Sequence, residues 1–234
     1  MAFGRGPNVI FLHGWGGSVE SFRFVANRLS AEFSVTLVDL YGFGETPEPE
    51  RPFGVRDYAD GVVEVMNDLG ITSAVFVCHS FGGRIGLELA VKMPHLVDKL
   101  VLIDSAGLKP RRKPSYYIKV WTHKLLKRRG KGLKGSDDYR ALTPVMRASF
   151  VKIVNYYQDA LLPSVRSPVA LFWGRFDKDT PIYMAKRFRR RLPDCALFWL
   201  NGGHFSYTED FNNFFAVLKS FLCSPPQTDT DGNK

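Results

Sequence analysis

One stretch constrains the fold of this chain most strongly: a run of β-forming residues stops at a serine and continues directly as a helix pattern. The run Val75–Cys78 is strand-like, Ser80 follows it closely, and Gly82 and Gly83 come next. A serine in so tight a strand-to-helix turn adopts a strained backbone conformation that raises its hydroxyl above the end of the sheet. Glycines after it let the helix pack close to the strand. The stretch therefore predicts a nucleophile elbow, G-x-S-x-G, with Cys78 in place of the first glycine.

The rest of the regular sequence alternates between strand and helix patterns. The runs are apolar on consecutive positions, which is typical of strands buried on both faces. The expected strands are Pro7–Leu12, Ser34–Val38, Val75–Cys78, Lys99–Ile103, Val169–Trp173 and Ala196–Leu200. The expected helices are Ser21–Leu29, Val55–Leu69, Ile85–Met93, Pro181–Arg191 and Asp210–Leu222. This alternation predicts an α/β fold: a three-layer α/β/α sandwich with a mostly parallel sheet of about six strands.

The alternation stops between residues 108 and 162, where the sequence is aromatic, basic and helical in pattern. The chain carries 32 Lys and Arg against 23 Asp and Glu, and 11 of these basic residues with no acidic one lie between Lys109 and Lys134. Such a cluster attracts anionic substrates, acidic lipid or nucleic acid, or is simply a solvated face. We favour the solvated face, because no aromatic-and-glycine nucleic-acid motif accompanies the charge. We expect residues 1–107 and 163–223 to form the core and residues 224–234 to be a disordered tail.

Cysteines and apolar runs indicate the class of protein. Cys78, Cys195 and Cys223 are odd in number, which favours free thiols over a disulfide framework, and no Cys/His spacing resembles a zinc site. The apolar runs are strand-sized and too short to cross a bilayer, and Val9–Leu12 is too short for a signal sequence. We therefore expect a cytoplasmic protein without membrane insertion, nucleic-acid partner, metal or cofactor.

Three chemically suggestive residues follow predicted strands, and parallel strands bring their ends to one edge of the sheet. For Ser80 to attack a carbonyl it needs a base, an acid that orients the base, and N–H donors for the oxyanion. His204 is the candidate base and Asp177 the candidate acid. The backbone N–H groups of Phe81 and Trp15 are the candidate donors. Asp179 and Asp104 are alternative positions for the acid.

These motifs together resemble the α/β-hydrolase fold family, in its branch of esterases, C–C-bond hydrolases and peroxidase-like enzymes. The matching stretches span about Val9 to Leu222. They are His13–Ser18, Asp39–Gly44, His79–Gly83, Trp173–Asp177 with Pro181, and Gly203–Phe205. The chain order Ser, Asp, His is the order of that family. The resemblance implies that residues 108–162 are a helical cap inserted after the Lys99–Ile103 strand.

The resemblance also implies details of the sheet edge and the pocket. Family members begin with an antiparallel ribbon, which we expect to be missing here because only Met1–Gly6 precede the first strand; the Ser34–Val38 strand would then be an exposed edge. We expect Trp15, Tyr117, Trp121 and Phe205 to line the substrate pocket. Further cap aromatics would pack in the cap core or roof: Tyr116, Phe150, Tyr156 and Tyr157. The remaining histidines are expected to pack or lie on the surface: His13, His79, His95 and His123.

The sequence therefore predicts a serine hydrolase that cleaves a small carboxylic ester, which can be anionic, through an acyl-enzyme. One alternative is a C–C-bond hydrolase of a vinylogous diketone, which uses the same triad. Another, from a different class, is a hydrolase-like receptor that turns over its ligand slowly and recruits a partner through the cap. We expect a monomer or a weak homodimer.

Overall fold

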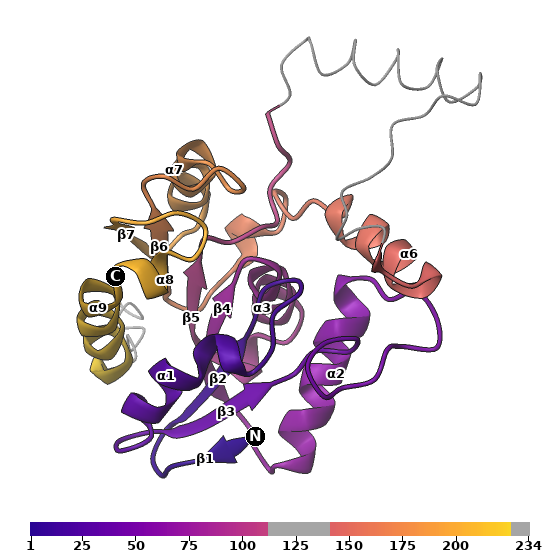
Figure 1. Ribbon diagram of the computed structural model, residues 1–234. Helices are drawn as coiled ribbons and strands as arrows, with labels where there is room; N and C mark the ends of the chain where they lie inside the picture. Colours follow the sequence, from indigo (N-terminus) through magenta and orange to yellow (C-terminus); the bar gives the residue numbers. More distant parts are fainter. Residues whose placement is uncertain (112–140, 226–234) are drawn as a thin grey trace, which may run out of the picture.

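The structure is a computed structural model that describes residues 1–111 and 141–225. It contains a seven-stranded sheet with the order β1-β3-β2-β4-β5-β6-β7 (Figure 1). Every neighbouring pair is parallel except β1 and β3, which are antiparallel. The strands are β1 (Ala2–Phe3), β2 (Asn8–Leu12), β3 (Ser34–Val38), β4 (Ala74–His79), β5 (Val97–Ile103), β6 (Val169–Gly174) and β7 (Cys195–Leu200).

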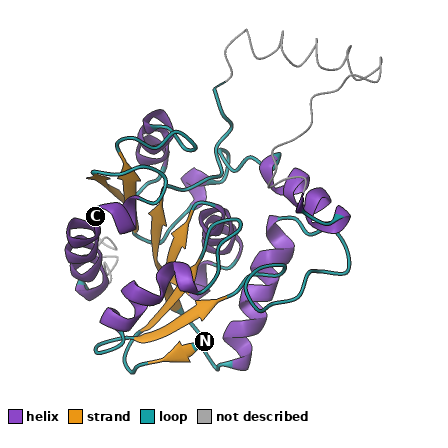
Figure 2. Ribbon diagram, viewed as in Figure 1, coloured by secondary structure: helices purple, strands orange, loops and turns teal. Residues whose placement is uncertain are grey.

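Helices cover both faces of this sheet (Figure 2). Side chains of α1 and α9 form one core with one face, and side chains of α2, α3 and α7 form a second core with the other. The helices are α1 (Glu20–Leu29), α2 (Val55–Asp68), α3 (Phe81–Lys92), α6 (Pro144–Val154), α7 (Ile182–Arg191), α8 (Ser206–Glu209) and α9 (Phe211–Cys223), with short 3-10 helices η1 (Pro94–Leu96) and η2 (Leu162–Ser164). The predicted three-layer α/β/α sandwich is confirmed.

Strand β4 shows why the strands read as continuous apolar runs. All six of its residues are buried. Phe76 and Cys78 enter the core beneath α2 and α3, whereas Val75 and Val77 enter the core beneath α1 and α9. Because successive side chains point to opposite faces, a strand covered on both sides has no polar alternation.

The edge of the sheet differs from the sequence prediction. We expected no strand before β2 and an exposed β3, but Ala2 and Phe3 pair antiparallel with Thr36 and Val35 of β3. Between β1 and β2 the chain reverses at Gly4, whose φ of 87° suits glycine. Phe3 packs against the core beneath α1 and α9, which holds the two-residue strand in place. The sheet therefore has seven strands, and β1 shields part of β3.

Helix α3 begins four residues earlier than predicted, at Phe81. Gly82 and Gly83 belong to the first turn of this helix, because Ser80 alone completes the turn from β4. The other predicted helices and strands agree with the observed ones to within two residues at each end.

Only part of the predicted cap lies within the described residues. In that part, α6 packs over the loops that follow β2 and β3: the Ser149 hydroxyl accepts a hydrogen bond from the Phe53 N–H, and the Phe150 ring contacts the Trp15 ring at 5.1 Å. Tyr116, Tyr117, Trp121, His123 and most of the basic cluster lie outside the described residues. The cap as a unit stays a prediction.

Two further expectations concern the cysteines and the membrane. All three cysteines are free; Cys78 and Cys195 are buried and Cys223 is exposed. Within residues 1–111 and 141–225, every helix is too short or too polar to cross a bilayer.

Candidate active site

Ser80 forms the turn between β4 and α3 in the predicted strained conformation. Its φ is 48° and its ψ is −104°, in a region that non-glycine residues avoid. Its N–H donates to the Ile103 carbonyl, and the Gly82 N–H donates to the His13 carbonyl. A Cβ on Gly82 would overlap the Leu12 carbonyl, and one on Gly83 would overlap the Ser105 hydroxyl. The glycines therefore allow the helix to approach the sheet as predicted.

Cys78 occupies the first position of the elbow without distorting it. Its sulfur faces Gly86 of α3, where a Cβ would lie only 2.8 Å from the sulfur. The missing side chain at Gly86 thus makes room for the extra atoms at Cys78. Burial raises the pKa of the Cys78 thiol strongly, so the group stays protonated and is not a competing nucleophile.

The structure brings Ser80, His204 and Asp177 together from the ends of three strands. The Ser80 hydroxyl and His204 Nε2 are 2.9 Å apart, and His204 Nδ1 and Asp177 Oδ2 are 2.9 Å apart. Ser80 follows β4, Asp177 follows β6, and His204 follows β7. With Nδ1 protonated, His204 donates to Asp177 and accepts from the Ser80 hydroxyl. This continuous chain of hydrogen bonds is the arrangement that an activated serine requires.

The Asp177 carboxylate is held by its own loop. Oδ1 accepts from the N–H groups of Asp179 and Thr180, and Oδ2 accepts from the Thr180 hydroxyl at 2.5 Å as well as from His204. Burial opposes ionisation, but the hydrogen bonds from His204 and Thr180 outweigh it and lower the pKa of Asp177 below its usual value. Asp179 contributes its backbone, and its side chain is exposed.

The environment of His204 favours its protonated form. Burial alone would lower the pKa of His204, but the hydrogen bond and the charge of Asp177, with smaller contributions from Asp104 and Asp179, raise it above 6.5. A base of this kind accepts a proton from a serine more readily than an unperturbed imidazole does.

Asp104, the alternative acid, lies close by but does not contact the imidazole. Its Oδ1 accepts from the Gly174 N–H at 2.7 Å and its Oδ2 accepts from the Ser206 hydroxyl at 2.5 Å. Burial raises the pKa of Asp104 to about 7. Asp177 alone takes the position of the acid beside His204 Nδ1.

Two other histidines hold loops of the site. His79 Nε2 lies 2.7 Å from the His204 carbonyl, and burial lowers the pKa of His79 to about 3, so it is neutral. His13 Nδ1 lies 2.7 Å from the Gly14 carbonyl, and His13 Nε2 accepts from the Leu40 N–H. His95 is exposed. The expected packing and surface roles of these three residues are confirmed.

The two candidate oxyanion donors flank the serine. Among the described residues, no carbonyl or side chain accepts a hydrogen bond from the N–H of Trp15 or Phe81. The loop before Trp15 runs beside the nucleophile, because a Cβ on Gly14 would lie 3.4 Å from Ser80 Cβ. The Trp15 ring packs edge-on against Phe81 at 5.5 Å between ring centres.

Of the other residues expected to line the pocket, Phe205 lies within the described part of the chain. Its ring is 54 % exposed and lies against the rings of His79 and His204. Tyr117 and Trp121 lie outside the described residues. The sequence prediction did not include Thr180, which bonds Asp177, or Ser206, which bonds Asp104. The available signal was their position, three residues after Asp177 and two after His204.

One group of side chains within the described residues has the composition of a cation site: Asp177, Asp179 and His204, with ligand atoms within 4.8 Å of one another. Both nitrogens of His204 and both oxygens of Asp177 already have protein partners. A metal ion would have to replace these hydrogen bonds, so the donor set fits proton transfer better than metal binding.

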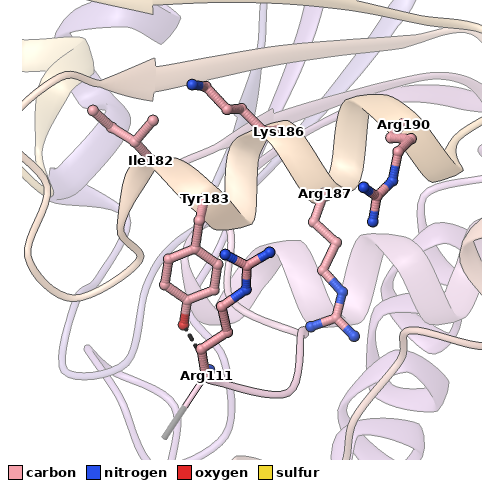
Figure 3. A pocket seen from close by; sticks show the side chains of 6 residues that line it. All are labelled: Arg111, Ile182, Tyr183, Lys186, Arg187 and Arg190. Atoms are coloured by element: carbon pink, nitrogen blue, oxygen red, sulfur yellow. Dashed lines mark hydrogen bonds between the residues drawn. The ribbon is translucent and has the colours of Figure 1, made fainter. Parts of the chain in front are cut away.

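A separate cavity of about 360 Å³ lies beside α7 (Figure 3) and contains none of the predicted site residues. Its lining is strongly basic: Arg111, Ile182, Tyr183, Lys186, Arg187 and Arg190. The Arg111 guanidinium lies over the Tyr183 ring at 5.0 Å, and Arg187 forms an ion pair with Asp159. Arg111 belongs to the basic segment that the sequence singled out.

Residues 7–126, about half of the chain, match the family described as alpha/beta hydrolase fold. The chain belongs to the alpha/beta hydrolase fold family. The first curated relatives are matched over less than a third of their length: an uncharacterized protein of Mycobacterium tuberculosis is 32% identical over 105 residues, which are 45% of this chain and 31% of that protein. A pimeloyl-[acyl-carrier protein] methyl ester esterase from Pseudoalteromonas atlantica is 26% identical, over 89% of this chain and 92% of that one.

Solved structures of alpha/beta hydrolases share the fold of this family member. An esterase from Exiguobacterium antarcticum superimposes with a TM-score of 0.78 at 20% identity, covering 96% of this chain and 94% of that one. A meta-cleavage product hydrolase from Pseudomonas fluorescens IP01 superimposes with a TM-score of 0.75 at 21% identity, covering 95% and 93%. These superpositions show the alpha/beta hydrolase fold that the sequence predicted.

Proposed function

We propose that this protein is a hydrolase, namely a serine esterase that cleaves a small carboxylic ester through a Ser80–His204–Asp177 triad. The observation that carries the proposal is the unbroken hydrogen-bond chain from the Ser80 hydroxyl through the His204 ring to the Asp177 carboxylate. It supports acyl transfer, because each member has the partner that its role requires.

In the proposed reaction Ser80 Oγ attacks the ester carbonyl carbon while its proton passes to His204 Nε2. The new negative charge on the carbonyl oxygen is stabilised by the N–H groups of Phe81 and Trp15. Asp177 stabilises the imidazolium, which then gives its proton to the leaving alkoxide, so that an alcohol departs and an acyl-enzyme remains. Water repeats the sequence on the acyl-enzyme, releases the carboxylic acid and restores the Ser80 hydroxyl.

The experiment that tests this proposal combines Ser80→Ala with a fluorophosphonate probe. Wild-type protein should become labelled on Ser80 and lose p-nitrophenyl ester hydrolysis in proportion. The alanine variant should remain folded, resist labelling and lose turnover by about 10⁶-fold. Undiminished ester hydrolysis in the folded variant would refute the proposal. Ser105→Ala is a matched control, since Ser105 is a buried serine after the next strand and its hydroxyl donates to the Ala106 carbonyl of the same loop.

A C–C-bond hydrolase is the second candidate, because the meta-cleavage product hydrolase has the same fold. The two reactions share the site and differ in the bond that is cleaved. A panel of short- and long-chain esters together with a vinylogous diketone, analysed for products, separates them. Turnover of the diketone with negligible ester hydrolysis would favour the second candidate.

A further part of the proposal is that the enzyme prefers anionic esters to neutral ones. The cavity beside α7 contains none of the triad residues, but its four cationic side chains and the basic segment Lys109–Lys134 attract anions to the protein surface. Esters with a carboxylate in the acyl group should therefore have a higher kcat/KM than neutral esters at low ionic strength. This preference should weaken as salt is added, because salt screens exposed charges. Equal rates for both ester classes would remove this part of the proposal.

A further inference from the structure

Asp104 is a buried carboxyl group that the proposed reaction does not use. It follows β5, its side chain is 0 % exposed, and its φ of 45° places it in the left-handed region. Because a non-glycine residue persists there only when its surroundings hold it, such strain points to a role for the side chain. The described residues contain no Lys or Arg within ion-pair distance of this carboxylate.

The hydrogen bonds of Asp104 join the two loops that carry the acid and the base. Oδ1 accepts from the N–H of Gly174, the residue that ends β6 and begins the loop to Asp177. Oδ2 accepts from the hydroxyl and the N–H of Ser206, two residues after His204.

The backbone of Asp104 strengthens the same connection. Its N–H donates to the Phe172 carbonyl of β6. Its own carbonyl lies 3.2 Å from the Thr180 hydroxyl, whose hydrogen goes to the nearer Asp177 Oδ2 at 2.5 Å. Asp104 is therefore tied to β6 and its following loop, and to Ser206 after His204, by four hydrogen bonds.

The charge of Asp104 acts on the same loops. The titratable groups that face it are Asp177 after β6, His204 after β7 and Tyr207 of α8. Burial raises the pKa of Asp104 to about 7, with a smaller contribution from the Asp177 charge, whereas the hydrogen bonds from Gly174 and Ser206 lower it. Its negative charge in turn raises the pKa of His204.

We propose that Asp104 is a positioning residue that holds His204 and Asp177 in hydrogen-bonding register through its bonds to Ser206 and Gly174. The proposal rests on the proposed triad. Its role differs from that of a general structural contact in one measurable way: loss of its charge should change the protonation of His204 as well as the geometry of the loops.

The test uses Asp104→Asn, which keeps the size and one acceptor but removes the charge. Expected are a kcat lower by about 10- to 100-fold, since small misplacements of reacting groups carry such costs, a KM within about twofold, and an acid limb of the pH–rate profile at lower pH. Ser206→Ala removes the bonding hydroxyl without a charge, so its kcat should fall while its acid limb stays in place. Asp98→Asn is the control, because Asp98 is an exposed residue of the same strand.

Failure of the Asp104 proposal can be distinguished from failure of the proposed triad. Wild-type kcat and an unmoved acid limb in Asp104→Asn, whatever its melting temperature, would overturn the proposal. Equal effects in Asp98→Asn would do so as well. Should Asp104→Asn fail to fold, Ser206→Ala decides: an unchanged kcat there overturns the proposal. If wild-type Ser80 itself resists fluorophosphonate labelling, the triad has failed, and this is detected before any Asp104 variant is compared.

Discussion

Lys99 offers a quantitative test of how the last helix is fastened to the sheet. It lies on β5, is only 5 % exposed, and extends its ammonium to the end of α9. Nζ donates to the carbonyls of Phe221 at 2.7 Å, Leu222 at 3.3 Å and Ser224 at 2.5 Å. These carbonyls have no partner inside the helix, so a cation there completes the helix end.

The perturbation is Lys99→Met, which keeps the apolar stem and removes the charge. Losing charge-assisted hydrogen bonds costs about 1.5–3 kcal/mol, and losing the interaction with the helix dipole costs about 0.3–1 kcal/mol. Burial lowers the pKa of Lys99, so desolvation of the ammonium offsets part of this gain. We expect a net loss of about 2–3 kcal/mol in the free energy of unfolding, or roughly 5–10 °C in Tm for a chain of this size.

The assay is urea unfolding followed by circular dichroism, with Tm measured in parallel. Lys219→Met is the matched control: Lys219 lies on the same helix and pairs with Glu32 at the surface, so its loss should change stability little. The reasoning fails if Lys99→Met shifts the unfolding free energy by less than about 0.5 kcal/mol, the range of ordinary surface substitutions, or if both variants lose the same amount.

Three further predictions concern the site. The pKa of His204 is raised above 6.5, and the proposed mechanism needs the neutral imidazole, so kcat/KM should rise with pH through a midpoint above 6.5. A midpoint below that value in a pH–rate profile would contradict His204 as the general base. Asp177→Asn should lower kcat by about 10⁴-fold, as measured by steady-state kinetics on folded protein, because the amide favours the wrong tautomer of His204; a loss of less than about tenfold would assign the acid elsewhere. Gly82→Ala should destabilise the protein by about 1–3 kcal/mol and slow fluorophosphonate labelling of Ser80, because the added methyl group overlaps the Leu12 carbonyl and pushes α3 away from β2. An unfolding free energy and a labelling rate equal to those of the wild type would refute this close packing of α3 against β2.

The parallel core of the fold could be predicted because local and long-range preferences agree there. Buried on both faces, β4 is apolar throughout, and its end is marked by a serine and two glycines. The same rule places Ser80, Asp177 and His204 at strand ends, and so the three could be grouped from the sequence. Their order along the chain matched the family resemblance.

What the sequence did not reveal depends on long-range contacts. Strand β1 has two residues, too few for any periodic pattern, and its pairing with β3 follows from the reversal at Gly4. The contacts of Asp104 join residues 70 and 102 positions apart. An aspartate after a strand reads equally well as a loop residue or as a catalytic acid, and only the folded arrangement shows which loops it joins.

The positive φ angles of Ser80 and Asp104 have a consequence for directed evolution. Among the described residues, these are the non-glycine positions with such angles, and they directly follow the adjacent strands β4 and β5. Glycine at Ser80 would relieve the backbone, so a library screened only for heat resistance should enrich this replacement. At Asp104 the relief is offset, because glycine would leave the buried Gly174 N–H and Ser206 hydroxyl without their acceptor. A screen for robustness should therefore fix the Ser80 codon, or require turnover in every round.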